Sequence, residues 1–478
     1  MNKNALLLLV GIAIVLGGCT MAPKYTRPGA PVPAAWPTGA AYKETKAATS
    51  PPTAWKLRWR EFFTDEHLQK IIETALNNNR DLRLAALNVE RARALYGVQR
   101  AELFPAVSAV GTGSKQRSSS DLTRPGEPRT TKQFNVNLGI TSWEIDFFGR
   151  IRSLKEQALE EYLGTEQARR SAQIALVAEV ARVYLTLAAD RGNLKLAQST
   201  LETQQGAYDL IRRQYEVGLA NELGLRRAQT QVDAARGNVA RFMQLVAQDQ
   251  NALNLLAGSP VSKQLLPADL SSVSSFKEIS PGLSSEVLLR RPDIMGAEHQ
   301  LKAAYAFIGV ARAALFPRIA LTTAVGTASD ELSGLFNSGS GTWSFAPQIT
   351  MPIFDARTWA ALRVSKTVRK IALTQYEKVI QTAFREVADS LAVQCTVDRQ
   401  VKAQQSLVNA LAETYRLSMK RYTHGIDSYL GVLDAQRSLY AAQQGLIALR
   451  LGKLANQVSL YAVLGGGGDQ PRAHQGRS

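Results

Sequence analysis

Two very long stretches of the chain, 150–215 and 357–422, carry apolar residues every three or four positions. This spacing is that of one face of an α-helix, so it predicts two continuous helices. At 1.5 Å per residue each helix would be about 99 Å long, which exceeds normal globular helices and suggests coiled-coil packing. The apolar positions of the first stretch include Ile174, Val177, Val180, Val183, Tyr184 and Leu187.

A glycine ends each long helical pattern, and a second, shorter pattern follows it. Gly218 precedes the pattern over 222–257, and Gly425 precedes the pattern over 428–463. Because glycine adopts the left-handed backbone of tight turns without steric cost, both breaks predict helical hairpins. Each returning arm is only about 54 Å long, so a further helix is needed to match the long one. By length, we pair 222–257 with a helix over 285–314, and 428–463 with a helix over 66–100.

Four other segments alternate between apolar and small or polar residues, which is the period of a β-strand. They span 104–118, 131–148, 316–328 and 342–356, and the clearest alternation is Phe134, Val136, Leu138 and Ile140. Amphipathic strands of this length fit an outer-membrane barrel, although a soluble hairpin packed on the helices is an alternative. The smallest membrane barrels have about eight strands, so four strands predict that several chains share one barrel.

The same arrangement occurs twice along the chain. AELFP at 101–105 aligns with AALFP at 313–317, and Gly218 and Gly425 take equivalent places. Each half reads as a helix, two strands and two helices, which indicates duplication of one structural unit. The predicted organisation is a signal peptide 1–18, an extended segment 19–64, a first repeat 65–260, an equatorial connector 261–284, a second repeat 285–464 and a flexible tail 465–478.

The first residues indicate export. Lys3 is followed by an apolar run over 5–16 and then by Leu-Gly-Gly before Cys19, which is the order of a secretory signal. The stretch resembles a bacterial lipobox, which implies cleavage before Cys19, a diacylglycerol on its thiol and an acyl chain on its new amino group. The alternative is a plain signal peptide with an accidental cysteine. Thr20 stands where an aspartate would signal retention in the inner membrane.

Composition and motifs argue against an enzyme or a nucleic-acid-binding protein. The net charge is +17, but the basic residues are spread along helical faces in runs no longer than two. Such a distribution lacks the patch that nucleic acid requires. The four histidines show neither zinc-ligand spacing nor a Ser/His/Asp arrangement, and no phosphate-binding loop is present. We therefore expect no enzyme activity, no metal and no cofactor beyond the covalent lipid.

Several motifs together resemble those of the OprM-type outer-membrane lipoproteins of the TolC family. They are the lipobox, WREFF at 59–63, NNRDLRLAALNVE at 78–90, WEIDFFGRIRSL at 143–154, RRPDI at 290–294, LFP in both halves and LDAQRSLY at 433–440. The resemblance covers nearly the whole mature chain. It implies an α+β membrane protein: a homotrimer with a twelve-stranded barrel in the outer-membrane lipid and a long helical coiled-coil tunnel in the periplasm. It also implies the exit duct of a tripartite multidrug efflux pump, docked to a periplasmic adaptor and an inner-membrane resistance-nodulation-division transporter.

The resemblance also assigns roles at the hairpin tips. The position of Asp434 contributes to an acidic ring, and that of Leu430 to an apolar constriction one turn earlier. The position of Tyr422 helps to hold the hairpins closed. Three copies of one carboxylate around an axis would favour cations. The equivalent place in the first hairpin is taken by Arg227, so the halves have diverged in role.

One departure from the family concerns tip closure. Relatives often place an acid six residues after the first-hairpin glycine, whereas this chain has Gly224 there. Glu222 is a nearby substitute. Other candidates for tip contacts are Tyr215, Arg421 and Asp427.

Two alternatives to an efflux duct remain at this point. A type I protein-secretion duct would have the same architecture and a different inner-membrane engine. A periplasmic coiled-coil scaffold lipoprotein would lack amphipathic membrane strands, which the alternation over 134–140 argues against. In the favoured interpretation the chain is a passive duct for drugs and other small toxic compounds, opened at its tip by the adaptor.

Overall fold

The structure is a computed structural model that describes residues 20–42, 57–279 and 284–466. Cys19 and the predicted signal peptide lie outside these residues, as does most of the predicted tail. The described chain is mostly helical with one four-stranded sheet. It forms two compact units, and each unit combines segments from both halves of the sequence. Within the described residues, the first unit holds 20–29, 88–166 and 296–376, and the second holds the remainder.

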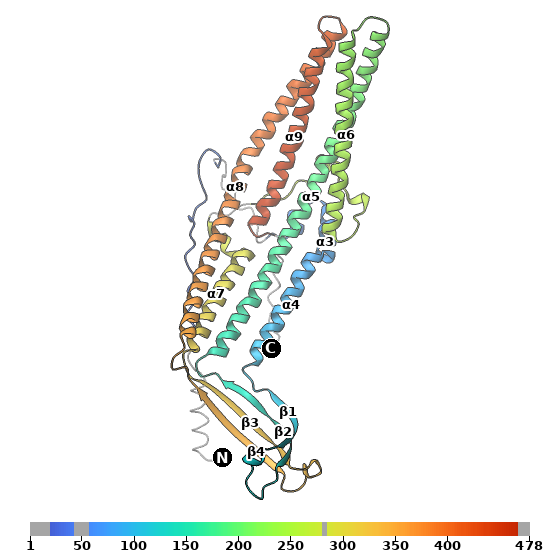
Figure 1. The fold of residues 1–478 in the computed structure, drawn as a ribbon. Helices are drawn as coiled ribbons and strands as arrows, with labels where there is room; N and C mark the ends of the chain where they lie inside the picture. Colours follow the sequence, from blue (N-terminus) through green and yellow to red (C-terminus); the bar gives the residue numbers. More distant parts are fainter. Residues whose placement is uncertain (1–19, 43–56, 280–283, 467–478) are drawn as a thin grey trace. The chain divides into compact units, whose positions relative to one another are not determined.

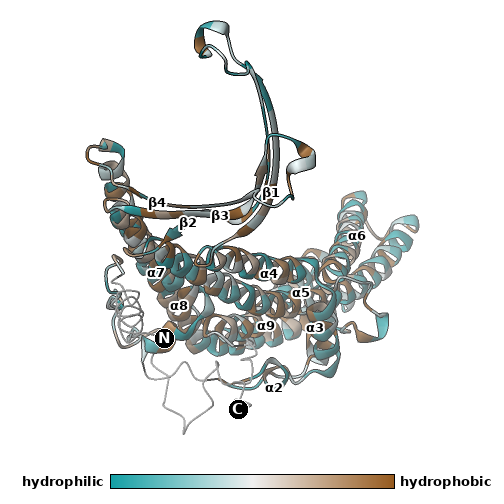
Figure 2. Ribbon diagram, turned by 90° about the horizontal axis from the view of Figure 1, so that it is seen from below, coloured by the Kyte–Doolittle hydropathy of each residue, from teal (hydrophilic) through white to brown (hydrophobic). Residues whose placement is uncertain are grey.

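The first unit contains the sheet. Its strands run antiparallel in the order β1-β2-β3-β4, and they form the curved single layer of Figure 2. The two outer strands, β1 and β4, each have a neighbour on one side only. The strands are β1 (Val107–Arg117), β2 (Thr130–Ile145), β3 (Arg318–Ser329) and β4 (Gly341–Thr350).

The register places most of the large apolar residues of the four strands on one face. Leu138 lies opposite Ala109 on one side and Val325 on the other, and Val325 lies opposite Trp343. Directly opposed residues of antiparallel strands share a face, so these side chains form one apolar surface. The other face carries residues such as Thr112, Asn135, Asn137, Thr322, Ser344 and Gln348.

A β-bulge in β2 keeps this surface continuous. The pairing with β3 shifts between Ile140 and Trp143, and Ser142 within the bulge has a left-handed backbone with φ 53°. The extra residue lets Trp143 lie opposite Leu321, on the same face as Ile140. Simple alternation from Phe134 would have placed Trp143 on the polar face, so sequence periodicity could not have located the bulge.

The second unit contains the tips and most of the length of two helical hairpins (Figure 1). Helix α5 (Arg150–Glu216) turns back into α6 (Glu222–Ala257), and α8 (Ala356–Thr423) turns back into α9 (Tyr429–Val463). The helical spacing of the sequence predicted these four elements to within one residue at each end. Helix α5 has a window long and apolar enough to cross a membrane, the one such helix in the described chain, but 61% of that window is buried.

The helix predicted over 66–100 is divided into two. Helix α3 (Glu66–Asn78) ends at Asn79, and α4 (Arg80–Ala101) begins directly after it. Asn79 causes the break because its backbone is extended and its side-chain oxygen accepts a hydrogen bond from the Leu82 amide, at 2.9 Å. The helix predicted over 285–314 is likewise a short 3₁₀ helix, η5 (Ser285–Arg290), followed by α7 (Pro292–Ala313), because proline is favoured at a helix start.

The pairing of the short helices differs from the one expected by length. The end of α6 abuts the α3–α4 break, where the Asn79 amide donates to the Leu256 carbonyl at 3.0 Å. The end of α9 meets the start of α7, where Arg291 donates to the Val463 carbonyl at 2.8 Å. Each returning helix therefore continues into the short helix of its own half. Length alone could not decide this, because the two returning arms are almost equally long.

An aromatic cluster forms part of the core of the second unit. The ring of Phe62 stacks on that of Tyr461 with centroids 4.1 Å apart, and Phe63 and Phe276 pack edge-on or tilted against them. Phe62 belongs to a short helix, α2 (Trp59–Phe62), within the segment expected to be extended. The WREFF motif therefore joins this segment to the C-terminal helix.

Candidate functional site

Both hairpin turns are built on a left-handed glycine. Gly218 has φ 78° and Gly425 has φ 70°, values that only glycine adopts without strain. The chain then closes back on the long helix, since the Leu219 amide donates to the Gln214 carbonyl at 2.8 Å. In the second hairpin the Ile426 amide donates to the Arg421 carbonyl at 2.9 Å. The two tips therefore share one backbone design, as the sequence repeat predicted.

Arg421 and Asp427 form an ion pair across the second turn. The guanidinium donates to both carboxylate oxygens, at 2.5 and 3.1 Å. Hydrogen bonding from Arg421 lowers the pKa of Asp427. Because both side chains are about half exposed, water screens the pair and it contributes little to stability. Both belong to the same hairpin, so this contact shapes a tip and does not join two tips.

Tyr422 connects the two hairpins of one chain. Its hydroxyl donates to the side-chain carbonyl of Gln214 on α5, at 3.2 Å. Its ring also packs against Tyr429 at the start of α9, with centroids 5.0 Å apart. The sequence analysis did not single out Gln214 or Tyr429. A signal for Tyr429 was available, because Tyr415, Tyr422 and Tyr429 recur at intervals of seven residues.

Burial affects the tyrosines of this tip. The pKa of Tyr429 is raised to about 12, first by burial and then by the neighbouring Tyr415 and Tyr422. The Tyr429 hydroxyl is buried and has no hydrogen-bond partner among the described residues. The base of the second turn is thus an apolar aromatic contact, closed on one side by the Tyr422–Gln214 hydrogen bond.

The other residues expected at the tips do not join this contact. Tyr215 is 41% exposed, and Glu222 pairs with Arg226 on its own helix, at 3.4 Å. Glu222 is thus not part of the hydrogen bond that joins the tips, which is formed by Tyr422 and Gln214. Leu430 is 53% exposed near the start of α9.

Asp434 projects from α9 as an exposed carboxylate. It accepts a hydrogen bond from Arg437 at 2.7 Å, and the two side chains are 66% and 74% exposed. Asp233 on α6 makes the same kind of pair with Arg236, at 3.1 Å. Within one chain the two acids have nearly the same local environment.

The WEIDFFGR motif builds the junction between β2 and α5. Arg150 donates to both oxygens of Glu144, each at 2.8 Å, and Arg318 at the start of β3 also pairs with Glu144. Asp146 accepts from the Arg152 amide at 2.9 Å. Phe148 stacks on Phe316 of the second LFP motif, with centroids 4.9 Å apart. The motif thus fixes the direction in which the helix leaves the sheet.

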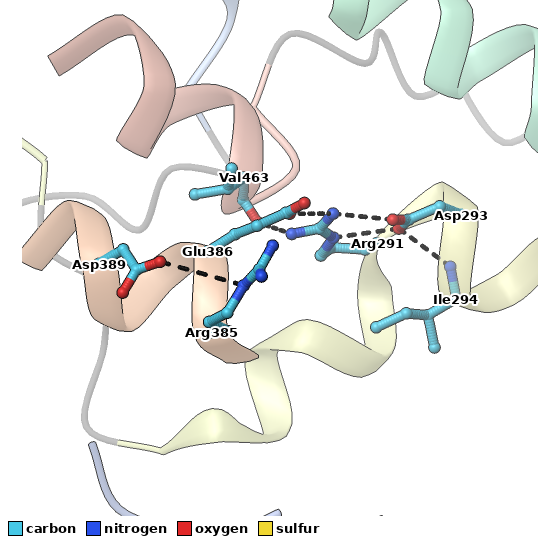
Figure 3. Close-up of polar contacts among 7 residues, drawn as sticks. All are labelled: Arg291, Asp293, Ile294, Arg385, Glu386, Asp389 and Val463. Carbon is cyan, nitrogen blue, oxygen red and sulfur yellow. Dashed lines mark hydrogen bonds and ion pairs between the residues drawn. The ribbon is translucent and has the colours of Figure 1, made fainter. Parts of the chain in front are cut away.

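The RRPDI motif builds a buried junction of three helices (Figure 3). Arg291 donates to Asp293 at 3.0 and 2.7 Å, to Glu386 of α8 at 3.0 Å and to the Val463 carbonyl of α9 at 2.8 Å. The Arg291 side chain is only 11% exposed. A planar guanidinium satisfies this many fixed acceptors at once, which an ammonium group cannot do. The motif is therefore structural.

No group of three or more His, Cys, Asp and Glu side chains within the described ranges is placed to hold a metal ion. The features that stand out in the described chain are an open amphipathic sheet and two linked helical tips.

A family model described as outer membrane efflux protein matches residues 71–259 and 283–466, which together make up most of the chain. The chain belongs to the outer membrane efflux protein family, whose members are transport channels of the outer membrane. This assignment agrees with the resemblance drawn from the sequence motifs.

Two relatives illustrate the similarity. The probable efflux pump outer membrane protein TtgC of Pseudomonas putida is 50% identical over 469 residues, covering 98% of this chain and 96% of the relative. The outer membrane protein OprJ of Pseudomonas aeruginosa is 41% identical over 464 residues, covering 97% of this chain and 96% of the relative.

Solved structures show the same fold. The open state of the Neisseria gonorrhoeae MtrE outer membrane channel is 37% identical, with a TM-score of 0.83 over 94% of this chain and 98% of that one. A membrane protein from Pseudomonas aeruginosa is 40% identical, with a TM-score of 0.85 over 94% of this chain and all of that one. The chain is accordingly an efflux protein of the outer membrane that extends into the periplasm.

Proposed function

We propose that three copies of this chain form one channel, with β4 of each copy pairing with β1 of the next. The observation that carries this proposal is the open amphipathic sheet. Its outer strands each have one unpaired edge among the described residues, and one face carries a band of large apolar side chains. Free edges cannot face hydrocarbon unsatisfied, so a membrane-spanning sheet must close. Three copies would supply twelve strands, which is enough for closure.

In this proposal the channel is the exit duct of a tripartite efflux pump for drugs and other small toxic compounds. The names of its relatives support the cargo class, because they include an antibiotic efflux pump protein and a toluene efflux pump protein, both from Pseudomonas putida. A periplasmic adaptor and an inner-membrane transporter of the resistance-nodulation-division type would supply cargo and open the tip.

We further propose that Leu430 and Asp434 line the narrowest part of the periplasmic end. Both are exposed on α9 within one chain, as residues facing a pore would be. Three copies of Asp434 would focus a negative potential on the axis. The Tyr422–Gln214 bond would hold the two hairpins of each chain together in the closed state, and the Arg421–Asp427 pair would hold the shape of the inner turn.

Single-channel recording in a planar bilayer tests this gate, with Asp434→Ala as the variant. Asp233→Ala is a matched control, because Asp233 makes the same exposed pair on the other hairpin. We expect Asp434→Ala to reduce cation selectivity and block by divalent cations severalfold, whereas the control leaves both unchanged. Equal selectivity in the two variants would show that Asp434 does not line the constriction.

We also propose that Cys19 carries the lipid anchor. The segment that follows it is fastened to α7 within the first unit. Arg312 donates to the Met21 carbonyl at 3.1 Å, and Tyr25 and Arg27 both donate to Glu298, which is buried. An anchor placed so close to a fixed segment would have a defined position. Mass spectrometry should show a diacylglycerol and an acyl chain on the wild-type N-terminus and neither on Cys19→Ser.

A further inference from the structure

Three cations continue the apolar face of the sheet beyond its last aromatic residue. On this face Gly113 lies opposite Phe134, and the next pair along the strands is Lys115 opposite Lys132. Arg117, two residues further on, belongs to the same face. Lys115, Arg117 and Lys132 are exposed, and none of them has an ion-pair partner among the described residues. We call these three residues the basic rim.

The arrangement of the basic rim calls for an anion from outside the chain. Like charges directly opposite each other in a sheet are destabilising, and their Cβ atoms are only about 5 Å apart. The nearby loop 118–129 carries Asp121 and Glu127. Asp121 accepts a hydrogen bond from Ser120, and neither acid pairs with a residue of the basic rim. The other distal loop, 330–340, adds Asp330 and Glu331, which do not pair with it either.

The basic rim lies where an apolar membrane band would end. On β2 the apolar face extends from Phe134 to Ile145. Without the extra bulge residue this distance is ten residue steps, as on β3 from Ser329 to Ile319. At about 3.3 Å per step and a tilt of about 40° it spans roughly 25 Å, which matches the band of about 25 Å typical of outer-membrane barrels. The ring of Phe134 covers Gly113 at this boundary, since a Cβ on Gly113 would lie 3.1 Å from it.

The connections of the strands decide which side of the membrane the basic rim faces. Helices α4, α5, α7 and α8 all join the opposite ends of the strands. If these helices extend into the periplasm, as in the proposed function on which this inference rests, the basic rim lies at the extracellular boundary. The lipid there carries phosphate groups on its sugar headgroup.

We propose that the basic rim binds the phosphate groups of the phosphorylated glycolipid of the outer leaflet. Arg117 offers a planar fork that matches two phosphate oxygens, and the two lysines add point charges below it. Phe134 contacts the beginning of the acyl chains. The bound phosphate removes the repulsion between Lys115 and Lys132, and so fastens the edge strand β1 to β2.

The test measures lipid binding by native mass spectrometry of the purified full-length channel in detergent. The probes are diphosphorylated lipid A and the same lipid without phosphates. The variant removes the three charges and the control removes three exposed charges of α8: Lys115→Gln, Arg117→Gln and Lys132→Gln against Lys378→Gln, Arg399→Gln and Lys402→Gln. At about 1 kcal/mol per cation, we expect the basic-rim variant to bind diphosphorylated lipid A about a hundredfold more weakly.

We expect the wild type and the control to prefer the phosphorylated lipid, and tens of millimolar inorganic phosphate not to displace it. Three results would each overturn the proposal: affinity of the basic-rim variant within threefold of wild type, equal binding of both lipids, or displacement by free phosphate alone. The same spectra report the trimer mass, and conductance is recorded on the same preparations. A conducting trimer without lipid preference refutes this inference alone, whereas a protein that is neither trimeric nor conducting refutes the proposed function.

Discussion

At the scale of single residues, the hairpin tips depend on one contact that joins them and one that does not. The Tyr422 hydroxyl bonds Gln214 of the other hairpin, whereas Arg421 bonds Asp427 of its own. The charged pair is the stronger interaction in vacuum, but exposure to water screens most of its attraction. Its loss would loosen a turn, whereas loss of the Tyr422 bond would separate two hairpins.

Tyr422→Phe should therefore increase the conductance of the resting channel severalfold. The substitution removes only the hydroxyl, and a neutral hydrogen bond contributes about 1 kcal/mol to stability. A trimer would contain this bond three times. Tyr215→Phe is the control, because its hydroxyl makes no hydrogen bond within the described chain. Planar-bilayer recording measures both, and an unchanged resting conductance in Tyr422→Phe would assign tip closure to other contacts.

The sequence could supply the turn glycines and the partners within one turn, because these lie close along the chain. It could not supply Gln214 as the partner of Tyr422, since the two are 208 residues apart and an amide carries no distinctive signal. Nor can one chain distinguish Asp434 from Asp233, because the environments of these two acids differ only once three copies surround an axis.

At the scale of elements, the long helices were predictable and the breaks in the short ones were not. A sustained helical period over more than sixty residues is a strong signal. By contrast, Asn79 divides α3 from α4 through a cap and one hydrogen bond to Leu256, on a helix far away in the sequence. Tertiary contact overrides local propensity at such a place. The bulge at Ser142 also depends on tertiary contact, because the pairing of β2 with β3 determines its position.

A carboxyl pair between the arms of the first hairpin makes stability depend on pH. Burial, and then the charge of Asp190 on α5, raises the pKa of Asp249 on α6 from 3.8 to about 6. The folded protein thus holds a proton that the unfolded chain has released. The contribution of Asp249 to stability is full below about pH 4 and is lost as the pH rises through 6.

Asp249→Asn should therefore stabilise the folded protein at pH 7.5, by about 1 kcal/mol once solvent screening of this partly exposed group is counted, and have little effect at pH 4. Thermal melting followed by circular dichroism at both pH values measures this difference. Asp233→Asn, on the exposed face of the same helix, should alter the melting temperature equally little at both. An equal increase in melting temperature for Asp249→Asn at pH 4 and pH 7.5 would contradict protonation of Asp249 in the folded protein.

At the scale of the whole molecule, the sheet is the feature that a single chain leaves unfinished. Its apolar face requires the lipid of a membrane. The unpaired backbone groups of its two outer strands require strands of neighbouring copies. The sequence indicated this need from strand number alone. It could not indicate how closely β2 and β3 approach each other, which depends on small residues at particular crossings.

Gly139→Ala should reduce assembly of the trimer severalfold. A Cβ at Gly139 would lie well inside van der Waals contact of the Thr323 carbonyl and of Ala324 on β3, and these are atoms that cannot move aside. Gly111→Ala is the control, because its Cβ would meet its nearest neighbour at 3.9 Å. The heat-resistant trimer band on a denaturing gel measures assembly. Normal amounts for Gly139→Ala would mean that the strands can separate without loss of closure.

The bond between Tyr422 and Gln214 joins two groups that carry no charge in neutral solution. Dissolved ions screen charges and leave such a bond almost unaffected. The periplasm exchanges small ions with the surroundings. A contact made of charged groups there would weaken at high salt and strengthen at low salt. A hydrogen bond between a phenol and an amide should have nearly the same strength in both.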